Sequence, residues 1–439
     1  MRAGLRRVSK GHVEDECGDA GNMLRMRVGS AALLLVLTLE AASLGGQEWP
    51  QFRGPTGQGH AEARGLPLQW SETKNLKWKV PVNGHGWSSP VIGQGRVWLT
   101  TSVETPASGR DKAGLSLRAL AFDAETGTRV VDVEVFRLTH LRPLNVKNSF
   151  ASPTPILDGD RVYVHFGADG TAALSTSGEI LWKARYNYES QHGGGGSPVL
   201  YNDLLIFNCD GNENEAFVVA LDTRTGKERW KRDRRRPAAQ AYTTPLVISV
   251  NGRDQLISVG AYRAGAYDPA TGREIWRVGY PDGFSNVPRP VFGKGLVFIA
   301  TGFQQPTMIA VRADGEGDVT RSHIAWTLSR GAPFTPSPLL VGDELYIVSD
   351  TGVLTLVDAA SGLVHYQQRL GGNYSASPIL AEGRIYFLSE EGVATVIAPG
   401  KMFKRLAVNT LDGSTLASMA MSGGAIYVRS DSHLYRISS

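Results

Sequence analysis

Short apolar runs alternate with turn-forming residues along most of this 439-residue chain. The clearest runs are 96–99, 161–164, 204–207, 296–299, 344–348 and 384–388. Beyond residue 46, no stretch of about 12 residues has the i, i+3, i+4, i+7 apolar spacing of an amphipathic helix. The pattern therefore predicts an all-β protein with few helices.

A second pattern repeats at intervals of about 40 to 50 residues, which indicates a repeat architecture. Five times, a Gly preceded by Ser or Thr is followed four residues later by a bulky side chain, and four of these Gly follow an Asp by four residues. The sets are Asp123, Gly127 and Val131; Gly178 and Trp182; Asp222, Gly226 and Trp230; Asp268, Gly272 and Trp276; and Asp358, Gly362 and Tyr366.

Each repeat has a recognisable chemistry. The Asp can accept hydrogen bonds from backbone amides at the start of a turn, and the Gly supplies the positive φ that ends it. The chain then returns as a strand that carries an aromatic anchor. A single four-stranded unit cannot bury both faces, so neighbouring units must stack with the aromatic ring between them. This arrangement is typical of a β-propeller.

Counting the units predicts eight blades of four antiparallel strands. Seven blades open with a pair ending in Pro, at 89–90, 152–153, 197–198, 244–245, 289–290, 337–338 and 377–378. The last unit has strands expected at 418–421, 425–428 and 433–437 and lacks an outer strand. The unassigned strand 76–80 is expected to complete this blade and close the ring, which protects the sheet edges.

Composition and charge add limits. Glycine, at 51 residues, suits a fold with many tight turns, and the two cysteines, Cys17 and Cys209, cannot form a disulfide framework. The formal net charge of +4 gives no general electrostatic reason to expect nucleic acid as a partner.

The N-terminal residues have the pattern of a leader sequence for export. Arg25 and Arg27 precede the apolar run 31–39 and a segment of small residues, the order of a secretory signal peptide. We interpret residues 1–22 as a mis-assigned extension, 23–46 as the signal peptide, 47–75 as an irregular arm and 76–439 as the propeller. The expected location is secreted or periplasmic, with no transmembrane segment after the leader is removed.

The segments 220–230 and 266–276 resemble the pyrroloquinoline-quinone (PQQ)-type propeller repeat, and 49–55 looks like the opening of many secreted bacterial proteins with these repeats. The resemblance covers roughly residues 47–439. That superfamily includes quinoprotein alcohol and glucose dehydrogenases, the outer-membrane assembly scaffold BamB and many other secreted propellers, so the fold does not select a function.

The resemblance to the dehydrogenases implies PQQ held with calcium or a lanthanide by Glu, Asn and Asp, often beside adjacent disulfide-linked cysteines, with an Asp as base. This chain has no adjacent cysteine pair, and none of those motifs can be placed on it. We therefore predict no cofactor, no metal and no catalytic residue, with calcium-bound PQQ kept as an alternative. The oxygen-rich segment 209–215 could form a calcium site, and the basic run 231–236 could bind phosphate. We interpret both segments as solvated loops instead.

A candidate binding site remains at the residues just before each blade's first strand, which should surround one mouth of the central channel. Polar and aromatic side chains that converge on a concave mouth suit a small ligand or a peptide. Among them His85, His192 and Arg289 could donate to an anionic or sugar-like ligand; the alternative is that these side chains only plug a narrow channel. The set is His85, Trp87, Asn148, Ser149, Phe150, His192, Tyr242, Asn286, Arg289, Phe334, Asn373 and Tyr374.

The leading hypothesis is a non-catalytic binding or assembly scaffold that uses its channel mouth or its blade edges. Its partner would be a protein, peptide or glycan of the cell envelope, and no nucleic acid. Two alternatives stay open: a PQQ-dependent dehydrogenase or other envelope enzyme at the central channel, and a polysaccharide-binding adhesion module.

Overall fold

The computed structural model describes residues 47–107, 113–211, 215–234 and 240–439. The predicted extension and signal peptide, residues 1–46, lie outside the described residues, as do parts of the two loops considered above for calcium and phosphate. No helix within the described part of the chain is long and apolar enough to cross a bilayer.

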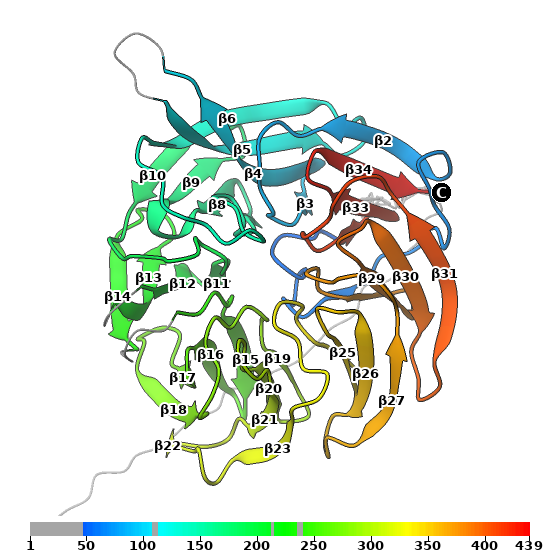
Figure 1. Ribbon diagram of the computed structural model, residues 1–439. Helices are drawn as coiled ribbons and strands as arrows, with labels where there is room; N and C mark the ends of the chain where they lie inside the picture. The colour runs from blue at the N-terminus through cyan, green and yellow to red at the C-terminus, as the bar shows by residue number, and fades with distance from the viewer. Residues whose placement is uncertain (1–46, 108–112, 212–214, 235–239) are drawn as a thin grey trace, which may run out of the picture. The chain divides into compact units, whose positions relative to one another are not determined.

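Eight sheets are arranged around a ring (Figure 1), so the prediction of an all-β, eight-bladed propeller with four-stranded antiparallel blades is confirmed. The first four blades are β3 (Val91–Gly93), β4 (Arg96–Thr105), β5 (Gly114–Asp123) and β6 (Arg129–Leu138); β7 (Ile156–Asp158), β8 (Arg161–His165), β9 (Thr171–Ser175) and β10 (Ile180–Ala184); β11 (Val199–Tyr201), β12 (Leu204–Asp210), β13 (Ala216–Asp222) and β14 (Glu228–Asp233); and β15 (Leu246–Val250), β16 (Arg253–Gly260), β17 (Arg263–Tyr267) and β18 (Glu274–Gly279).

The remaining blades continue in chain order. They are β19 (Val291–Gly293), β20 (Leu296–Ala300), β21 (Met308–Arg312) and β23 (Ile324–Leu328); β24 (Leu339–Val341), β25 (Glu344–Val348), β26 (Val353–Asp358) and β27 (Val364–Arg369); β28 (Ile379–Ala381), β29 (Arg384–Leu388), β30 (Val393–Ala398) and β31 (Lys404–Thr410); and β32 (Ala420–Ser422), β33 (Ala425–Arg429), β34 (His433–Ser438) and β2 (Leu76–Pro81). Two short strands add to blades in parallel, β22 (Gly317–Asp318) to β18 and β1 (His60–Ala61) to β28.

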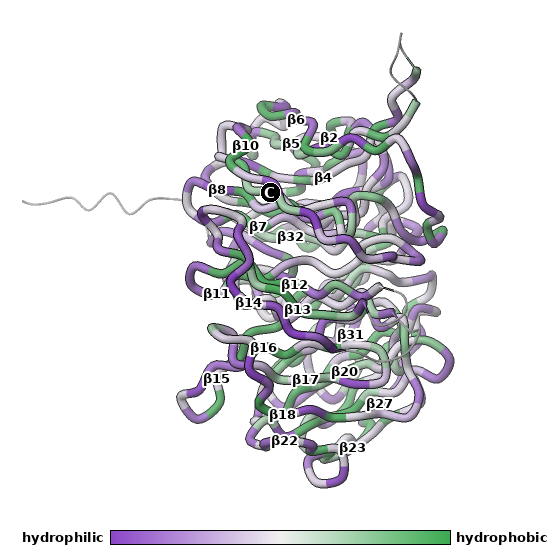
Figure 2. The backbone as a smooth tube through the Cα atoms, turned by 90° about the vertical axis from the view of Figure 1, so that its left-hand side faces the viewer, coloured by the Kyte–Doolittle hydropathy of each residue, from purple (hydrophilic) through white to green (hydrophobic). Residues whose placement is uncertain are grey.

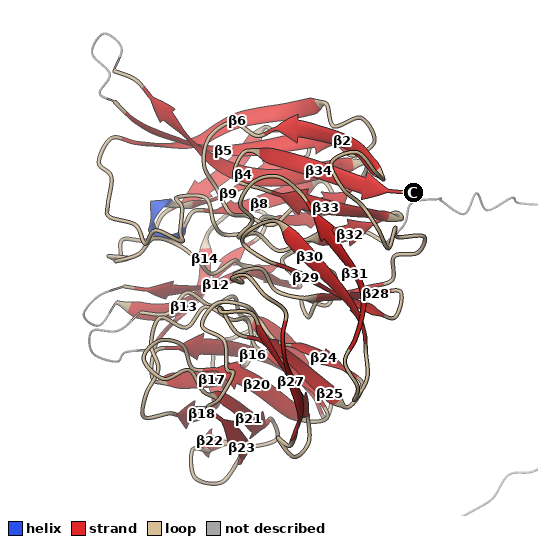
Figure 3. Cartoon of the chain, turned by 45° about the vertical axis from the view of Figure 1, so that its right-hand side comes forward, coloured by secondary structure: helices blue, strands red, loops and turns tan. Residues whose placement is uncertain are grey.

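Helix is almost absent, as predicted: a single 3₁₀ turn, η1 (Gly167–Asp169), is found in the described residues and follows β8 (Figure 3). The middle strands of the blades, such as β12 and β13, are mostly apolar, whereas outer strands such as β14 and many connecting turns carry hydrophilic residues (Figure 2). This difference arises because the middle strands pack both faces against neighbouring blades while the outer strands and turns reach solvent.

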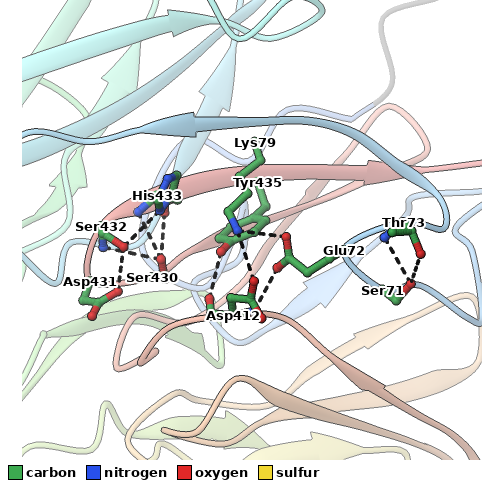
Figure 4. A network of polar contacts seen from close by, with 10 residues as sticks. All are labelled: Ser71, Glu72, Thr73, Lys79, Asp412, Ser430, Asp431, Ser432, His433 and Tyr435. Atoms are coloured by element: carbon green, nitrogen blue, oxygen red, sulfur yellow. Dashed lines mark hydrogen bonds and ion pairs between the residues drawn. The ribbon is translucent and has the colours of Figure 1, made fainter.

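The last blade takes its fourth strand from the N-terminal side of the ring. β2 pairs antiparallel with β34, from Leu76 opposite Ile437 to Pro81 opposite His433. Lys79 of β2 supports this seam (Figure 4): its Nζ lies 2.9 Å from Glu72 Oε2 and over the ring of Tyr435 at 5.1 Å. The Tyr435 hydroxyl donates to the Asp412 carbonyl oxygen at 2.8 Å.

The repeated Asp and Gly shape the turns. Asp222 Oδ1 accepts hydrogen bonds from Thr225 N at 2.9 Å and from the Thr225 hydroxyl at 2.8 Å, and the Gly226 amide donates to the Asp222 carbonyl oxygen at 2.8 Å. Gly226 has a φ of +69°. The turns opened by Asp123, Asp268 and Asp358 share the carboxylate–amide and carbonyl–Gly bonds.

Each of these turns receives the tryptophan of the preceding blade. Trp182 Nε1 donates to Thr223 O at 2.9 Å, and Trp230 Nε1 donates to Pro269 O at 3.0 Å. A Cβ at Gly272 would lie 2.5 Å from the Trp230 ring. Trp78 on the Gly127 turn and Trp326 on the Gly362 turn repeat the arrangement, so the aromatic side chain and the glycine of a docking pair come from adjacent blades.

Three interfaces depart from this pattern. Val131 replaces the indole against Gly178. Trp276 is fully buried, but its Nε1 donates to Gln255 Oε1, and Gln255 Nε2 in turn donates to the Ala313 carbonyl oxygen of the next blade. Tyr366 packs edge-on against Phe403.

The predicted irregular arm, 47–75, packs into the ring with its own buried tryptophans. Trp49 forms a bridge with Ile92, and Trp70 stacks on Tyr386. Both indoles are buried in the main apolar cluster of the ring. Between them, Arg53 donates to the Pro338 carbonyl oxygen at 2.8 Å, so this segment reaches the inner part of blade six.

Candidate functional site

A ring of hydroxyl side chains holds the inner ends of the blades together. In seven of eight positions a backbone N–H of one blade donates to the Ser or Thr hydroxyl oxygen of the next, at 2.8 to 3.1 Å. The circle closes because Ser418 N donates to Ser89 Oγ, which joins the last blade to the first. We call this set the hydroxyl belt: Ser89, Thr154, Ser197, Thr244, Ser337, Ser377 and Ser418.

Arg289 occupies the eighth position of the belt. Its backbone N–H donates to Ser337 Oγ at 3.0 Å like the other members. Its side chain has no hydroxyl oxygen to accept a backbone N–H from the preceding blade. Its Nε donates instead to the Pro245 carbonyl oxygen of that blade at 3.0 Å. The guanidinium also reaches the arm, where Nη1 donates to Phe52 O at 2.7 Å.

A cavity of about 440 Å³ lies on this belt. This volume is in the range of small-molecule sites in proteins. Its lining combines the seven belt hydroxyls with aromatic rings and a few polar groups: Phe52, Trp87, Tyr242, Phe284, Phe303, Phe334, Asn145, Lys147, Asn148, Ser152, His192, Thr335 and Ser375, among others. Phe52 comes from the arm, so the N-terminal segment contributes to the cavity wall.

One side of the cavity is aromatic. Phe284 lies 5.5 Å from Phe303, and Phe303 lies 6.2 Å from Phe334, measured between ring centroids. Phe303 is 54% exposed although it is a large apolar side chain. The His192 and Tyr242 rings are 6.0 Å apart, and the Tyr242 amide donates to the Asn286 carbonyl oxygen, close in sequence to Phe284. Apolar walls of this kind would bury the body of a ligand.

The connection after β6 spans part of the mouth. Lys147 lines the cavity and forms an ion pair with Glu390 of blade seven, at 2.8 Å between Nζ and Oε1. Arg142 of the same segment pairs with Asp169 at 2.6 Å. Val146 beside Lys147 is 97% exposed.

Five residues of the predicted mouth set line this cavity: Trp87, Asn148, His192, Tyr242 and Phe334. Asn148 Nδ2 donates to the His192 carbonyl oxygen at 2.6 Å, which holds two neighbouring blades at the mouth.

The other predicted mouth residues have different positions. His85 is exposed and lies edge-on to Trp87 at 5.1 Å. Ser149 and Asn286 are fully buried, and Asn286 accepts a hydrogen bond from the Tyr242 amide. Phe150 packs on the apolar cluster between blades one and two. Asn373 bonds to Glu391, and Tyr374 is buried against blade six.

Arg289 corrects our expectation most clearly. We expected it to present a donor to a ligand at the mouth beside His85 and His192. Its side chain is 1% exposed, is absent from the cavity lining and donates to backbone carbonyl oxygens on the side of the arm. The physical reason is that Arg289 stands where the other blades have a belt hydroxyl. Its own side-chain N–H groups make the hydrogen bond to the neighbouring blade in place of that hydroxyl.

Sequence reasoning missed Phe52, Lys147 and the belt. The Ser/Thr-Pro pairs that marked the blade openings contained the signal, because the hydroxyl residue recurs at the same place in most blades. Phe52 and Lys147 carry no repeat signal, and only the folded arrangement of the arm and the loop brings them to the cavity.

The donor set does not fit a metal-bound quinone. A calcium ion needs several hard oxygen ligands, usually carboxylates, and neither Asp nor Glu lines this cavity. Among the described residues, no cluster of three or more His, Cys, Asp or Glu side chains could hold a metal ion. Of the candidate calcium segment, residues 212–214 lie outside the described residues, and Asp210 is buried in an ion pair with Arg234.

Comparisons with known proteins agree with the fold. The family described as outer membrane protein assembly factor BamB matches residues 61–261, 118–368 and 260–416. Among solved structures, BamB from Moraxella catarrhalis has 13% sequence identity, a TM-score of 0.54, and coverage of 78% of this chain and 97% of that one. A europium-containing methanol dehydrogenase has 12% identity, a TM-score of 0.52, and coverage of 81% and 90%. No curated protein sequence matches significantly.

Proposed function

We propose that this chain, which belongs to the outer membrane protein assembly factor BamB family, is a non-catalytic scaffold of the cell envelope that binds a partner or ligand in the cavity at its channel mouth. The observation that supports this proposal best is the lining itself: aromatic walls over a ring of hydroxyls, with no carboxylate among the lining side chains. Such a surface can bind, but it lacks the paired carboxylates that many acid–base mechanisms use.

The expected location is the periplasm or the outside of the cell. Family membership supports an envelope role, and the predicted leader, which lies outside the described residues, would provide export. A peptide segment or a small molecule suits the volume of the cavity, whereas the aromatic rim with exposed Phe303 suits a partner that covers the mouth.

Reconstitution separates this proposal from quinone-dependent catalysis. The purified chain is incubated with PQQ and either calcium or a lanthanide, and dye reduction is followed with alcohols and sugars as substrates. We expect no dye reduction, because no Asp or Glu lines the cavity to serve as the base or to help hold the cation. Substrate-dependent dye reduction would refute the scaffold proposal.

A glycan array tests the adhesion alternative. The hydroxyl and aromatic groups of the cavity are of the kinds that bind sugars. If a specific glycan occupied this cavity, Trp87→Ala would abolish its binding. The scaffold proposal expects no glycan whose binding depends on Trp87.

A further inference from the structure

The hydroxyl belt carries O–H groups that have no acceptor in the described part of the chain. Each belt oxygen accepts a backbone N–H from the adjacent blade. A Ser or Thr hydroxyl has one proton to donate, and no described group accepts it from any of the seven. A buried donor without an acceptor is costly. The belt therefore presents a ring of donors that an acceptor in the cavity would satisfy.

Three buried arginines add positive charge to the surroundings of this ring of hydroxyl donors. Arg53, Arg289 and Arg429 are each 1% exposed, and none forms an ion pair with a described carboxylate. Arg289 bonds to the backbone of Phe52, a residue that lines the cavity. Arg429 Nη1 donates to Ser88 Oγ at 2.6 Å and to Thr100 O at 2.8 Å, directly beside the belt member Ser89.

These guanidinium groups also have spare donors. Nε and Nη1 of Arg53, and Nε and Nη2 of Arg429, are buried without a hydrogen-bond partner. Burial lowers the pKa of Arg289 and of Arg429 to about 9, and burial together with the nearby Arg289 lowers the pKa of Arg53 to about 9. All three remain charged at neutral pH.

The carboxylates near the mouth are engaged elsewhere. Glu390 pairs with Lys147, and Asp350 accepts hydrogen bonds from the amides of Phe334 and Thr335. Asp431 is exposed and bonds to Ser432. Charge in a poorly polarisable wall projects its field into an adjoining cleft more strongly than charge in water. Asp350, whose charge no ion pair with a described cation offsets, lies behind Phe334 and Thr335 and opposes part of this field. The three buried guanidinium groups outnumber it, so the cavity has a net positive bias.

We infer that the ligand of this cavity is a small organic anion, with its carboxylate toward the hydroxyl belt and its apolar body against the aromatic wall of Phe284, Phe303 and Phe334. This inference rests on the proposed function, because it names the chemical class of ligand for the same site. A carboxylate accepts several hydrogen bonds at once and carries the charge that the arginines favour.

A charge series on the full chain tests the inference. Calorimetric titrations at low ionic strength compare 2-naphthoate with its neutral isostere 2-naphthamide and with the cation 2-naphthylmethylammonium. We expect the anion to bind at least about tenfold more tightly than the amide, and the cation to bind least. Thr335→Trp, which fills the cavity, should abolish the heat of binding.

Two negative results of this titration would have different meanings. If the amide or the cation binds as tightly as the anion, and Thr335→Trp abolishes this binding, the cavity is a binding site but its anion preference is refuted. If none of the three probes binds at millimolar concentration, both the inference and the proposed cavity site fail.

Arg289→Ser isolates the contribution of the charge. It places a hydroxyl at the eighth belt position, as in the other seven blades, and keeps the backbone bond to Ser337. We expect the affinity for 2-naphthoate to fall about tenfold, toward that of the amide. The control Arg229→Gln removes an exposed arginine of the outer strand β14 and should leave the affinity unchanged. An unaltered affinity in Arg289→Ser would show that its charge does not select the ligand.

Discussion

At the scale of single residues, the stability of the ring depends on an indole of one blade that covers a glycine of the next. Trp230 shows why these two residue types recur together. Its ring is buried, its Nε1 has a carbonyl acceptor, and the space above Gly272 is too small for a Cβ. The sequence showed both residue types and their spacing, but it could not show that the glycine contacts the tryptophan of the preceding blade.

Trp230→Ala should therefore lower the free energy of unfolding by about 3–5 kcal/mol, the usual cost of truncating a buried aromatic residue. Chemical denaturation measures this change. Val408→Ala, which truncates an apolar side chain that is 52% exposed, is the matched control and should be nearly neutral. A loss below about 1 kcal/mol for Trp230→Ala would contradict inter-blade packing.

Gly272→Ala tests the contact itself. In the wild-type background it adds both a steric clash with Trp230 and the strain of a φ of +69°. In the Trp230→Ala background the clash is gone, so the second substitution should cost less. A double-mutant cycle should thus give a coupling of about 0.5–3 kcal/mol. Additive losses would show that the two residues do not touch.

His165 gives a pH dependence at the same scale. Its ring is 2% exposed, its Nδ1 lies 2.8 Å from Thr171 Oγ1, and burial lowers its pKa to about 3. The unfolded chain binds a proton near pH 6.5 while the folded chain does not, so stability is complete above that pH and is lost as the pH falls toward 3.

The contribution of His165 should reach about 1.4 kcal/mol per pH unit between roughly pH 6 and 4. His165→Phe keeps an aromatic ring against Phe207, which lies 4.5 Å from the imidazole. Its unfolding free energy, measured across this range, should fall less steeply with acidification than that of the wild type. Parallel curves would refute a neutral buried His165.

At the scale of the elements, the closing blade joins the two ends of the propeller. The apolar runs, the unpaired strand 76–80 and the incomplete last unit allowed the pairing of β2 with β34 to be predicted from the sequence. The strand limits shifted by one or two residues: Ala420–Ser422 replaces the expected 418–421, because Ser418 belongs to the belt. The packing of the arm could not be predicted, since its contacts join residues more than 200 positions apart.

Replacing residues 76–81 with a Gly/Ser linker of equal length should expose the edge of β34 while keeping the arm attached. Unpaired strand edges associate readily. Light scattering should detect oligomers, and the melting temperature should fall. A monomeric variant with an unchanged melting temperature would argue against closure by β2. Lys79→Met, which keeps the strand and removes its ion pair with Glu72, is the control and should stay monomeric.

At the scale of the whole molecule, eight similar blades produce one face that is unlike the rest. The belt, the arm and the loop after β6 meet at a cavity that no single repeat encodes. Five of the predicted mouth residues could be located from the repeat geometry alone, because the chain enters each first strand at this mouth. The direction of the Arg289 side chain could not be predicted in this way. It is set by the hydrogen bonds that the guanidinium donates to the carbonyl oxygens of Pro245 and Phe52, at a belt position that has no hydroxyl.

The most direct test of the account is site-specific photo-crosslinking in cells that produce the protein. A photoreactive phenylalanine replaces Phe303, which lines the cavity and is 54% exposed, and, as a control, Arg229 on the outer strand β14. We predict a discrete crosslinked product from position 303 that is competed by 2-naphthoate and is absent from position 229. Crosslinks from the outer strand alone, with none from the cavity, would contradict a scaffold that binds at its channel mouth.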